Sequence, residues 1–293
     1  MWGLVFLFPA LISAFTPLEL TIGRYLAYGV IALILILPHK RRLAGKLTSQ
    51  MWWVLMWLAL SGNTLYYILL ASAVQFGGIA MTSLVIGFLP VAVTIIGSRD
   101  RNAVALIRLI PSLIFCAISA VCIAWQALGI PSSRTTTAQV IGLSCAIGAL
   151  ISWTSYAVSN SRWLQRFDKV SIHDWNLLLG IVTGAQALLL APIGIWFATG
   201  EHDKNTWAYF AAACFGVGLL ASLIGNALWN KMSRLLPLTL VGQMILFETL
   251  FALVYGFLWE QRLPTFLETT ACVFVVLGVI SCIRVHHKPV ITE

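Results

Sequence analysis

The sequence predicts an all-α membrane protein in which ten transmembrane helices form two inverted repeats of five helices each. Three observations predict this fold: the apolar composition, the number of long apolar runs, and the placement of lysine and arginine between them. Of the 293 residues, 60% are hydrophobic and 10% are charged, whereas soluble domains carry about 25% charged residues. A globule of this length cannot bury so much apolar surface, so we expect an integral membrane protein.

The apolar runs predict the number of helices. A helix needs about 20 apolar residues to cross the hydrocarbon core of a bilayer. Ten runs approach this length, and they lie at 2–15, 17–38, 51–73, 79–97, 105–128, 138–160, 174–198, 207–230, 237–258 and 265–284. Pro9, Pro90, Pro111 and Pro192 lie inside runs and predict kinks there. The first run is short, which predicts that the natural chain begins about ten residues earlier or that its start was trimmed.

Lysine and arginine predict the orientation. If the N-terminus is cytoplasmic, fourteen of the 18 basic residues fall on cytoplasmic segments. These are Lys40, Arg41, Arg42, Lys46, Arg99, Arg101, Arg108, Arg162, Arg166, Lys169, Lys231, Arg234, Arg284 and Lys288. The outer loops hold Arg134, Lys204 and Arg262, and Arg24 lies within the second run. This asymmetry follows the positive-inside rule, so both termini are predicted to be cytoplasmic.

The two halves of the chain carry similar motifs in the same order. Three pairs match: "WGLVFL" (2–7) with "WTSYAV" (153–158), "SGNTLYY" (61–67) with "IGNALWN" (224–230), and "GIAMTSLVIGFLP" (78–90) with "PLTLVGQMILFE" (237–248). With five helices in each half, the second half enters the membrane from the opposite side, as in many transporters. We therefore predict one repeat at 1–128, a second at 138–284, and a cytoplasmic tail at 285–293.

Several of these segments, taken together, carry a family resemblance. "WGLVFL", "GRYLAYG", Pro90, "SWTSYAV" and "WEQRLPTFLETTACVFVVLGVI" resemble the drug/metabolite transporter superfamily, and within it the ten-helix EamA-type members. The most specific motif is the last, with Glu260, Arg262 and Gly278. The resemblance implies a bacterial secondary transporter that exports amino acids or related metabolites. The aromatic amino acid exporter branch is a neighbour, although no motif assigns the chain to it.

Glu248 is a carboxylate in an otherwise almost fully apolar run, "LVGQMILFETLFALVYG". A charge at the centre of a membrane helix costs at least about 2.5–3.5 kcal/mol, so the acid needs compensation or a purpose. It can be structural, bonded to Gln243, Thr249 or another helix. It can also couple transport to protons or cations, because acids inside the membrane often mark such pathways. It stands where the first half has Pro90, so the resemblance assigns it no role.

Arg24 is the only basic residue well inside a run, since Arg108 and Arg284 lie near or at the ends of theirs. It lies about two turns into the second run, where it can extend to the outer interface or pair with Glu19 one turn away. The other reading is that it binds the carboxylate of a substrate.

Asparagines and aromatic residues complete the candidate site. Asn63 and Asn226 occupy matching places in the two halves, where their amides either cross-link helices or bind polar groups of a substrate. The central aromatic residues either pack in the core or line a cavity for an apolar side chain, and they are Tyr66, Tyr67, Trp153, Tyr156 and Trp229.

The sequence holds no HExxH, GxSxG or Walker motif, so we expect neither an enzyme nor a cofactor or metal site. The prediction is export of a small-molecule substrate, with amino acids as the leading class, across a bacterial inner membrane by alternating access. Membrane lipids are expected partners and nucleic acid is not; the oligomeric state stays open. A proton-coupled drug or cation exporter is the alternative, and a membrane receptor or assembly subunit that transports nothing is the alternative from another class.

Overall fold

The computed structural model describes residues 2, 12, 14–43, 45–77, 79–100, 103–128, 135–167, 170–198, 202–261 and 263–287. All regular secondary structure in these ranges is helical. The chain forms two compact units, described separately below. Unit 1 contains residues 1–71 and 159–234, and unit 2 contains residues 72–158 and 235–293. Each unit therefore takes segments from both predicted repeats, so the compact units do not coincide with the repeats.

Seven helical segments in the described part of the chain are long and apolar enough to cross a membrane. They are Leu18–His39, Ser49–Gly77, Leu106–Ile123, Thr136–Arg166, Ile172–Trp196, Lys204–Leu235 and Phe266–His286. These segments correspond to seven of the ten predicted runs. The first run, 2–15, falls mostly outside the described residues, and so do 288–293 of the predicted tail.

The two remaining runs are interrupted helices. The fourth run divides into α6 (Ile79–Ile86) and α7 (Leu89–Gly97), and Pro90 lies in the first turn of α7. The ninth run divides into α13 (Leu238–Met244) and α14 (Leu246–Glu260), and α13 begins directly after Pro237. Each predicted repeat therefore has its break in its fourth run. Proline accounts for the first break, since it cannot donate the backbone hydrogen bond that continuous helix would need.

The third run of each predicted repeat contains π-helix. In the first, η3 (Leu60–Thr64) joins α4 (Ser49–Ala59) to α5 (Leu65–Gly77). In the second, η4 (Gly218–Gly225) joins α11 (Lys204–Val217) to α12 (Asn226–Leu235). Both segments lie at the matched Gly-Asn motif, because η3 includes Asn63 and η4 ends immediately before Asn226. Short π-segments inside α-helices are frequent at functional sites.

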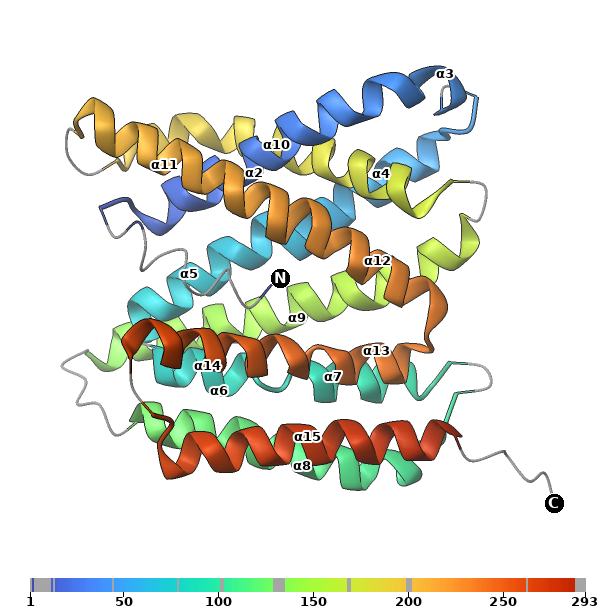
Figure 1. The fold of residues 1–293 in the computed structure, drawn as a ribbon, viewed down its shortest axis with the longest axis vertical. Coiled ribbons are helices and arrows are strands. Elements are labelled where there is room, and N and C mark those ends of the chain that lie inside the picture. Colours follow the sequence, from blue (N-terminus) through green and yellow to red (C-terminus); the bar gives the residue numbers. More distant parts are fainter. Residues whose placement is uncertain are drawn as a thin grey trace. The chain divides into compact units, whose positions relative to one another are not determined.

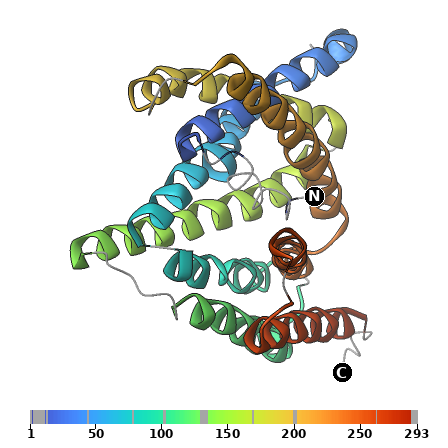
Figure 2. The same cartoon turned by 60° about the vertical axis from the view of Figure 1, so that its left-hand side comes forward.

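In unit 1, the main packing is between α2 (Pro17–Ile36) and α10 (Ile172–Trp196). Figure 2 shows α2, in blue, crossing α10, in yellow. A β-carbon added to Gly180 would lie 2.8 Å from Cβ of Ala32, and one on Gly29 would lie 2.7 Å from Cα of Gly184. Because higher residue numbers on α2 meet lower numbers on α10, the two helices run antiparallel.

Side-chain caps set the starts of these helices. Thr16 caps α2 in a reciprocal capping box with Glu19, and Pro17 is in its first turn. Ser171 caps α10 by accepting a hydrogen bond from the Asp174 backbone N–H. These caps satisfy N–H groups that a helix terminus otherwise leaves unpaired.

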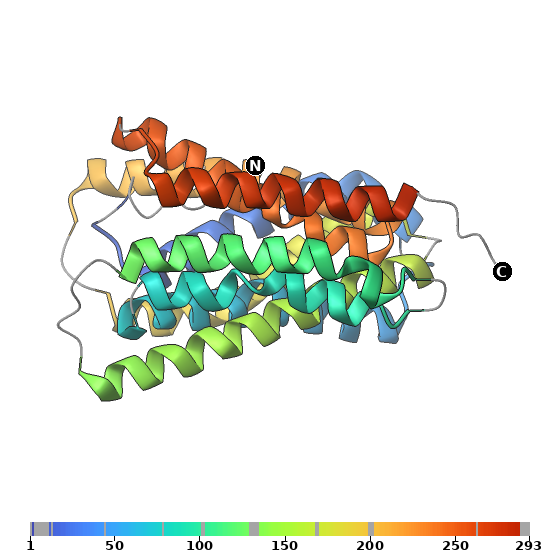
Figure 3. The same ribbon diagram turned by 90° about the horizontal axis from the view of Figure 1, so that it is seen from below.

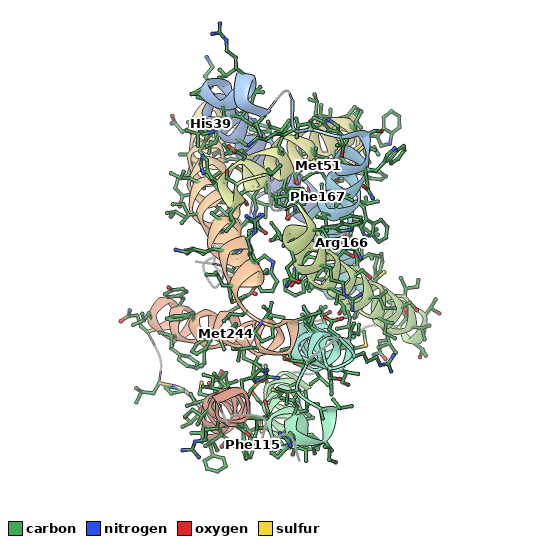
Figure 4. All side chains as sticks on the ribbon, turned by 90° about the vertical axis from the view of Figure 1, so that its right-hand side faces the viewer. His39, Met51, Phe115, Arg166, Phe167 and Met244 are labelled. Carbon is green, nitrogen blue, oxygen red and sulfur yellow. The ribbon has the colours of Figure 1, made fainter. Side chains whose placement is uncertain are left out.

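In unit 2, α8 (Leu106–Leu128) packs against α15 (Phe266–His287), as Figures 1 and 3 show. The Ser112 hydroxyl donates to the Gly278 carbonyl at 2.9 Å. A core cluster joins these helices to α14, and Figure 4 marks two residues near it, Phe115 on α8 and Met244 at the end of α13. The cluster consists of Cys116, Leu246, Val275 and Val279.

The helices α7 and α13 also run antiparallel within unit 2. A β-carbon on Gly97 would lie 2.9 Å from the Thr239 nitrogen, and one on Gly242 would lie 2.7 Å from the Thr94 hydroxyl. Such close approach depends on small residues, which is how many membrane helices associate.

Candidate functional site

Arg24 lies at the centre of a polar and aromatic cluster in unit 1. Its side chain is 7% exposed, and its Nε donates to the Ser222 hydroxyl at 2.9 Å. Its guanidinium carbon lies 5.1 Å from the ring centroid of Tyr25 and 5.3 Å from that of Tyr67. Both distances are within the range of a cation–π interaction. The arginine therefore lies inside the unit, where its contacts include a neutral hydroxyl and two aromatic rings.

The sequence suggested an ion pair between Glu19 and Arg24, but Glu19 has a different role in the structure. Its carboxylate accepts hydrogen bonds from the Thr16 backbone N–H at 2.7 Å and from the Thr16 hydroxyl at 2.8 Å. These bonds complete the cap of α2. Another acid in unit 1, Asp174, lies near the start of α10, and its Oδ1 is 2.9 Å from Nδ1 of His39. Both acids thus act at the ends of helices.

Trp2 and Trp229 extend the cluster along η4. The Trp2 indole donates to the Ala221 carbonyl at 3.0 Å, and its ring lies 5.1 Å from the ring of Trp229. A β-carbon on Gly225 would lie 2.7 Å from the Trp2 indole nitrogen. The absence of a side chain at Gly225 therefore makes room for the Trp2 ring. Because Ala221 precedes Ser222, one π-helical segment holds both the aromatic pair and the arginine contact.

The matched asparagines both face the interior of unit 1. Asn63 donates to the Thr183 hydroxyl at 3.2 Å, and Asn226 is hydrogen-bonded to the Tyr28 hydroxyl. Next to Asn63, the Thr64 hydroxyl donates to Gln186 Oε1 at 2.6 Å. These bonds join η3 to α10 and the start of α12 to α2, so each amide cross-links two helices. They support the structural reading of the asparagines and leave the substrate reading to experiment.

A chain of three more asparagines was not predicted from the sequence. Asn160 donates to Asn230 at 2.8 Å, and Asn230 donates to Asn176 at 3.4 Å. Asn176 donates to the Leu223 carbonyl at 2.9 Å and accepts from the Tyr28 hydroxyl. All three amides are fully buried. The sequence feature that could have indicated this chain is the presence of asparagines inside apolar runs, because an asparagine in a membrane helix often contacts a neighbouring helix.

Trp153 and Tyr156 belong to unit 2, on α9 (Thr136–Arg166). Both are buried, and their ring centroids lie 5.9 Å apart. Between them in sequence, the buried Thr154 hydroxyl has no hydrogen-bond partner among the described residues. The remaining predicted aromatic, Tyr66, is half-buried in unit 1 and contacts Tyr67. Six of the nine predicted site residues therefore fall in unit 1, and Trp153, Tyr156 and Glu248 fall in unit 2.

Glu248 lies in the first turn of α14, three residues after the break at Ile245. Its side chain is half-buried. A helix N-terminus carries a partial positive charge, which stabilises a carboxylate by about 0.3–1 kcal/mol and by up to about 2 kcal/mol in favourable geometry. That is less than the cost of about 2.5–3.5 kcal/mol for a charge at the bilayer centre. The helix break therefore offsets only part of the cost that a charged Glu248 would have at that depth.

A buried polar network in unit 2 ends beside this break. Gln243 donates to the Thr94 hydroxyl at 3.2 Å, and Cys116 donates to Gln243 Oε1 at 3.1 Å. The Thr94 hydroxyl in turn donates to the Thr239 carbonyl. Gln243 was considered as a partner for Glu248, and its identified partners are Thr94 and Cys116. The network fixes α13 against α7 and α8, immediately before the interruption.

Long apolar helices around buried amides, hydroxyls and one buried arginine define a multi-pass membrane protein. In the part of the chain that the structure describes, no group of His, Cys, Asp and Glu is arranged to hold a metal ion. The EamA-like transporter family matches residues 140–284. The inner membrane protein YtfF of Escherichia coli strain K12 is 30% identical over 315 residues, covering 100% of this chain and 94% of YtfF. The chain belongs to the EamA-like transporter family.

A solved crystal structure has a similar fold. It aligns with a TM-score of 0.74 over 96% of this chain and 91% of the other, at 16% sequence identity. At that identity, the similarity concerns the fold alone. The membership of a transporter family agrees with the sequence prediction that the chain is not an enzyme.

Proposed function

We propose that the chain is a secondary transporter that exports small metabolites, with amino acids as the leading class, across an inner membrane by alternating access. The inner membrane location is taken from the name of the relative YtfF. The observation that carries the proposal is the pairing of equivalent helices from the two predicted repeats. The second helix of the first repeat, α2, packs against the second helix of the second repeat, α10. The fourth helices of the two repeats, α7 and α13, also pack against each other.

The antiparallel direction of these pairs agrees with inverted repeats. Equivalent helices in repeats of opposite topology cross the membrane in opposite directions, and both pairs run antiparallel. The irregular segments also match, since the third helix of each repeat contains π-helix and the fourth is broken. These observations support the proposed ten helices in two repeats of five.

We propose that the residues that the sequence singled out bind the substrate, and each unit is taken by itself. In unit 1 these are Arg24, Asn63, Tyr66, Tyr67, Asn226 and Trp229, and in unit 2 Trp153 and Tyr156 are separate candidates. The composition of the unit 1 group, with one cation, two amides and several aromatic rings, suits a small polar molecule that has an apolar or aromatic part. Glu248 is the proposed coupling residue, because broken helices commonly form the ion sites of such transporters.

Counterflow in proteoliposomes tests this function. Vesicles loaded with one unlabelled amino acid at a time are diluted into the same labelled compound, and protein-free vesicles are the control. Uptake above the control with at least one amino acid is the expected result. Failure across the whole panel, with protein that elutes as a single species, would remove the amino acid class, and cationic drugs would be tested next. Saturable binding without flux would instead favour the receptor reading.

A further inference from the structure

Gln186 on α10 is hydrogen-bonded at both ends of the π-helical segment η3 in unit 1. Its amide nitrogen donates to the Met56 carbonyl at 3.1 Å, and its amide oxygen accepts from the Thr64 hydroxyl at 2.6 Å. Met56 lies in the last turn of α4, before η3, and Thr64 is the last residue of η3. One side chain therefore bridges the whole segment.

The bridge depends on the extra residue that a π-helix has. In an α-helix each residue turns the chain by about 100°, so residues seven apart share a face and residues eight apart differ by about 80°. Met56 and Thr64 are eight residues apart. In η3 a turn gains one residue, since the Leu65 N–H donates to the Leu60 carbonyl, five residues earlier instead of four. The pair therefore has the relation of residues seven apart in an α-helix, and both can reach one amide.

The π-helix also sets the direction of neighbouring side chains. If η3 became α-helix at the same chain length, the residues after the extra one would turn by about 100° relative to α4. Thr64 would then leave Gln186. The same turn would redirect three residues of the proposed substrate site, which are Asn63 in η3 and Tyr66 and Tyr67 after it.

The bonds of Gln186 stabilise a rare conformation. Runs of π-helix are rare in proteins, so the surrounding structure must hold them. Inside a membrane span there is no water to pair with polar groups that lose their bonds. In unit 1 the Gln186 amide and the Thr64 hydroxyl satisfy each other, and the Met56 carbonyl accepts from Gln186 as well as from the Leu60 N–H. A return to α-helix would break these side-chain bonds.

The π-helix of the second predicted repeat is held differently. Asn176, also on α10, donates to the Leu223 carbonyl at 2.9 Å, near the end of η4. Its amide oxygen accepts from Tyr28 and Asn230, which lie outside η4. The amide of Asn176 therefore bonds at one end of its π-helix, whereas that of Gln186 bonds at both ends.

We propose that Gln186 is a positioning residue of the transporter, which holds η3 as π-helix and so sets the direction of Asn63, Tyr66 and Tyr67. The inference rests on the proposed function, in which these three residues bind the substrate. Gln186 acts through η3 and does not itself need to touch the substrate.

Hydrogen exchange tests the bridge without any substrate. Gln186→Leu removes both bonds, and Thr64→Val removes one of them while keeping the shape of the side chain. The backbone amides of residues 60–66 are followed by mass spectrometry in the detergent-purified protein. We expect exchange there to be about tenfold faster in Gln186→Leu, the effect of losing one or two hydrogen bonds, and unchanged in η4. Unaltered exchange at 60–66 in both variants would overturn the proposal.

Counterflow tests the positioning, with an amino acid that the unaltered protein exchanges. Gln186→Leu and Thr64→Val should each raise the half-saturating concentration at least about tenfold, the effect of misplacing a good contact. The double variant should be no worse than the worse single variant, since both act through one bridge. Thr64→Ser keeps the hydroxyl and should keep the unaltered value. If Gln186→Leu does not fold, the comparison of Thr64→Val with Thr64→Ser still decides.

Thr48→Ala is the matched control for a purely structural effect. Thr48 caps the start of the same helix, α4, by accepting from the Met51 N–H at 3.3 Å. Its replacement should lower the melting temperature and leave the half-saturating concentration unchanged. A rise as large as that in Thr64→Val would mean that general weakening of α4 explains the effect, and the positioning role would be removed.

The outcome can be separated from that of the proposed function. Faster exchange in η3 together with no counterflow of any amino acid by the unaltered protein would contradict transport while retaining the bridge. Counterflow with an unchanged half-saturating concentration in both Gln186→Leu and Thr64→Val would retain transport and remove the positioning role.

Discussion

Gly29 and Gly184 face each other where α2 crosses α10, and a β-carbon on either glycine would lie 2.7 Å from the α-carbon of the other. Backbone at that distance cannot move aside as the tip of a flexible side chain can. The two helices can therefore approach this closely only while both positions are glycine. In the proposed repeats, this is the contact between the second helices of the two halves.

Replacing either glycine with alanine should separate α2 from α10. We expect Gly29→Ala and Gly184→Ala each to cost about 1–3 kcal/mol, the range for overpacking a tight interior. The measurement is the temperature at which half of the detergent-purified protein is lost from the monodisperse peak. Gly216→Ala is the control, because Gly216 lies in helix α11 and a β-carbon there would have no neighbour within 4 Å. If the control loses as much stability as the two tests, the close contact is not the cause.

The asparagine chain of unit 1 predicts a second stability effect. Asn176→Ala removes the donor to the Leu223 carbonyl and the acceptor for the Asn230 amide, so buried polar groups in η4 and α12 each lose a partner. We expect a loss of about 1–2 kcal/mol, between the general cost of such a group and the smaller values found within membranes. Ser144→Ala is the matched control, since Ser144 bonds to its own helix at an exposed position. If the Asn176→Ala protein is as stable as the control, the hydrogen-bonded amides do not stabilise the packing of these helices.

These two features show how much could be predicted from the sequence. Hydropathy identified the helices, because a segment that crosses a membrane needs a long run of apolar residues and such runs are visible in the sequence. It did not identify the crossing at Gly29 and Gly184, since a glycine alone does not specify its partner. Nor did it connect Asn160, Asn176 and Asn230, whose spacing in sequence reflects three different helices.

The interrupted helices were predicted in part. Pro90 inside the fourth run indicated a kink, and the structure has a break there, whereas α8 and α10 continue through Pro111 and Pro192. The ninth run has no proline at Ile245, so its interruption had no corresponding signal. The Gly-Asn motif marked both π-helical segments by position, yet nothing in it distinguishes π-helix from α-helix. For the site, the sequence selected Arg24 and the aromatic residues by their rarity and depth, but not Ser222, an ordinary hydroxyl in an apolar run.

The predicted orientation can be tested by labelling. Gly45→Cys lies in the predicted cytoplasmic loop before α4, where a side chain meets nothing within 4 Å. Asn205→Cys lies at the exposed start of α11, on the predicted outer side. In intact cells, a membrane-impermeant maleimide should label Asn205→Cys and should label Gly45→Cys only after permeabilisation. The unaltered protein measures the background from its six native cysteines. The opposite labelling pattern would reverse the orientation derived from lysine and arginine.

Glu248 gives the prediction that separates coupling from structure. Both Glu248 and Glu268 lie in the first turn of a helix, α14 and α15 respectively. Glu268 accepts a hydrogen bond from the Thr265 backbone N–H at 2.7 Å, so its carboxylate completes a cap as that of Glu19 does. Glu248 follows a break within a proposed membrane span, where no side-chain cap is present at Ile245. The two acids thus occupy the same position in a helix, but Glu268 caps the start of its helix and Glu248 follows a helix break.

We expect Glu248→Gln to retain counterflow and to lose accumulation driven by a pH gradient, because glutamine keeps the shape of the side chain without its proton. Glu268→Gln should retain both, since glutamine also serves in a capping box. The measurement compares both variants in proteoliposomes with and without an imposed gradient. Should Glu248→Gln respond to the gradient as the unaltered protein does, the acid is structural and does not couple transport to protons.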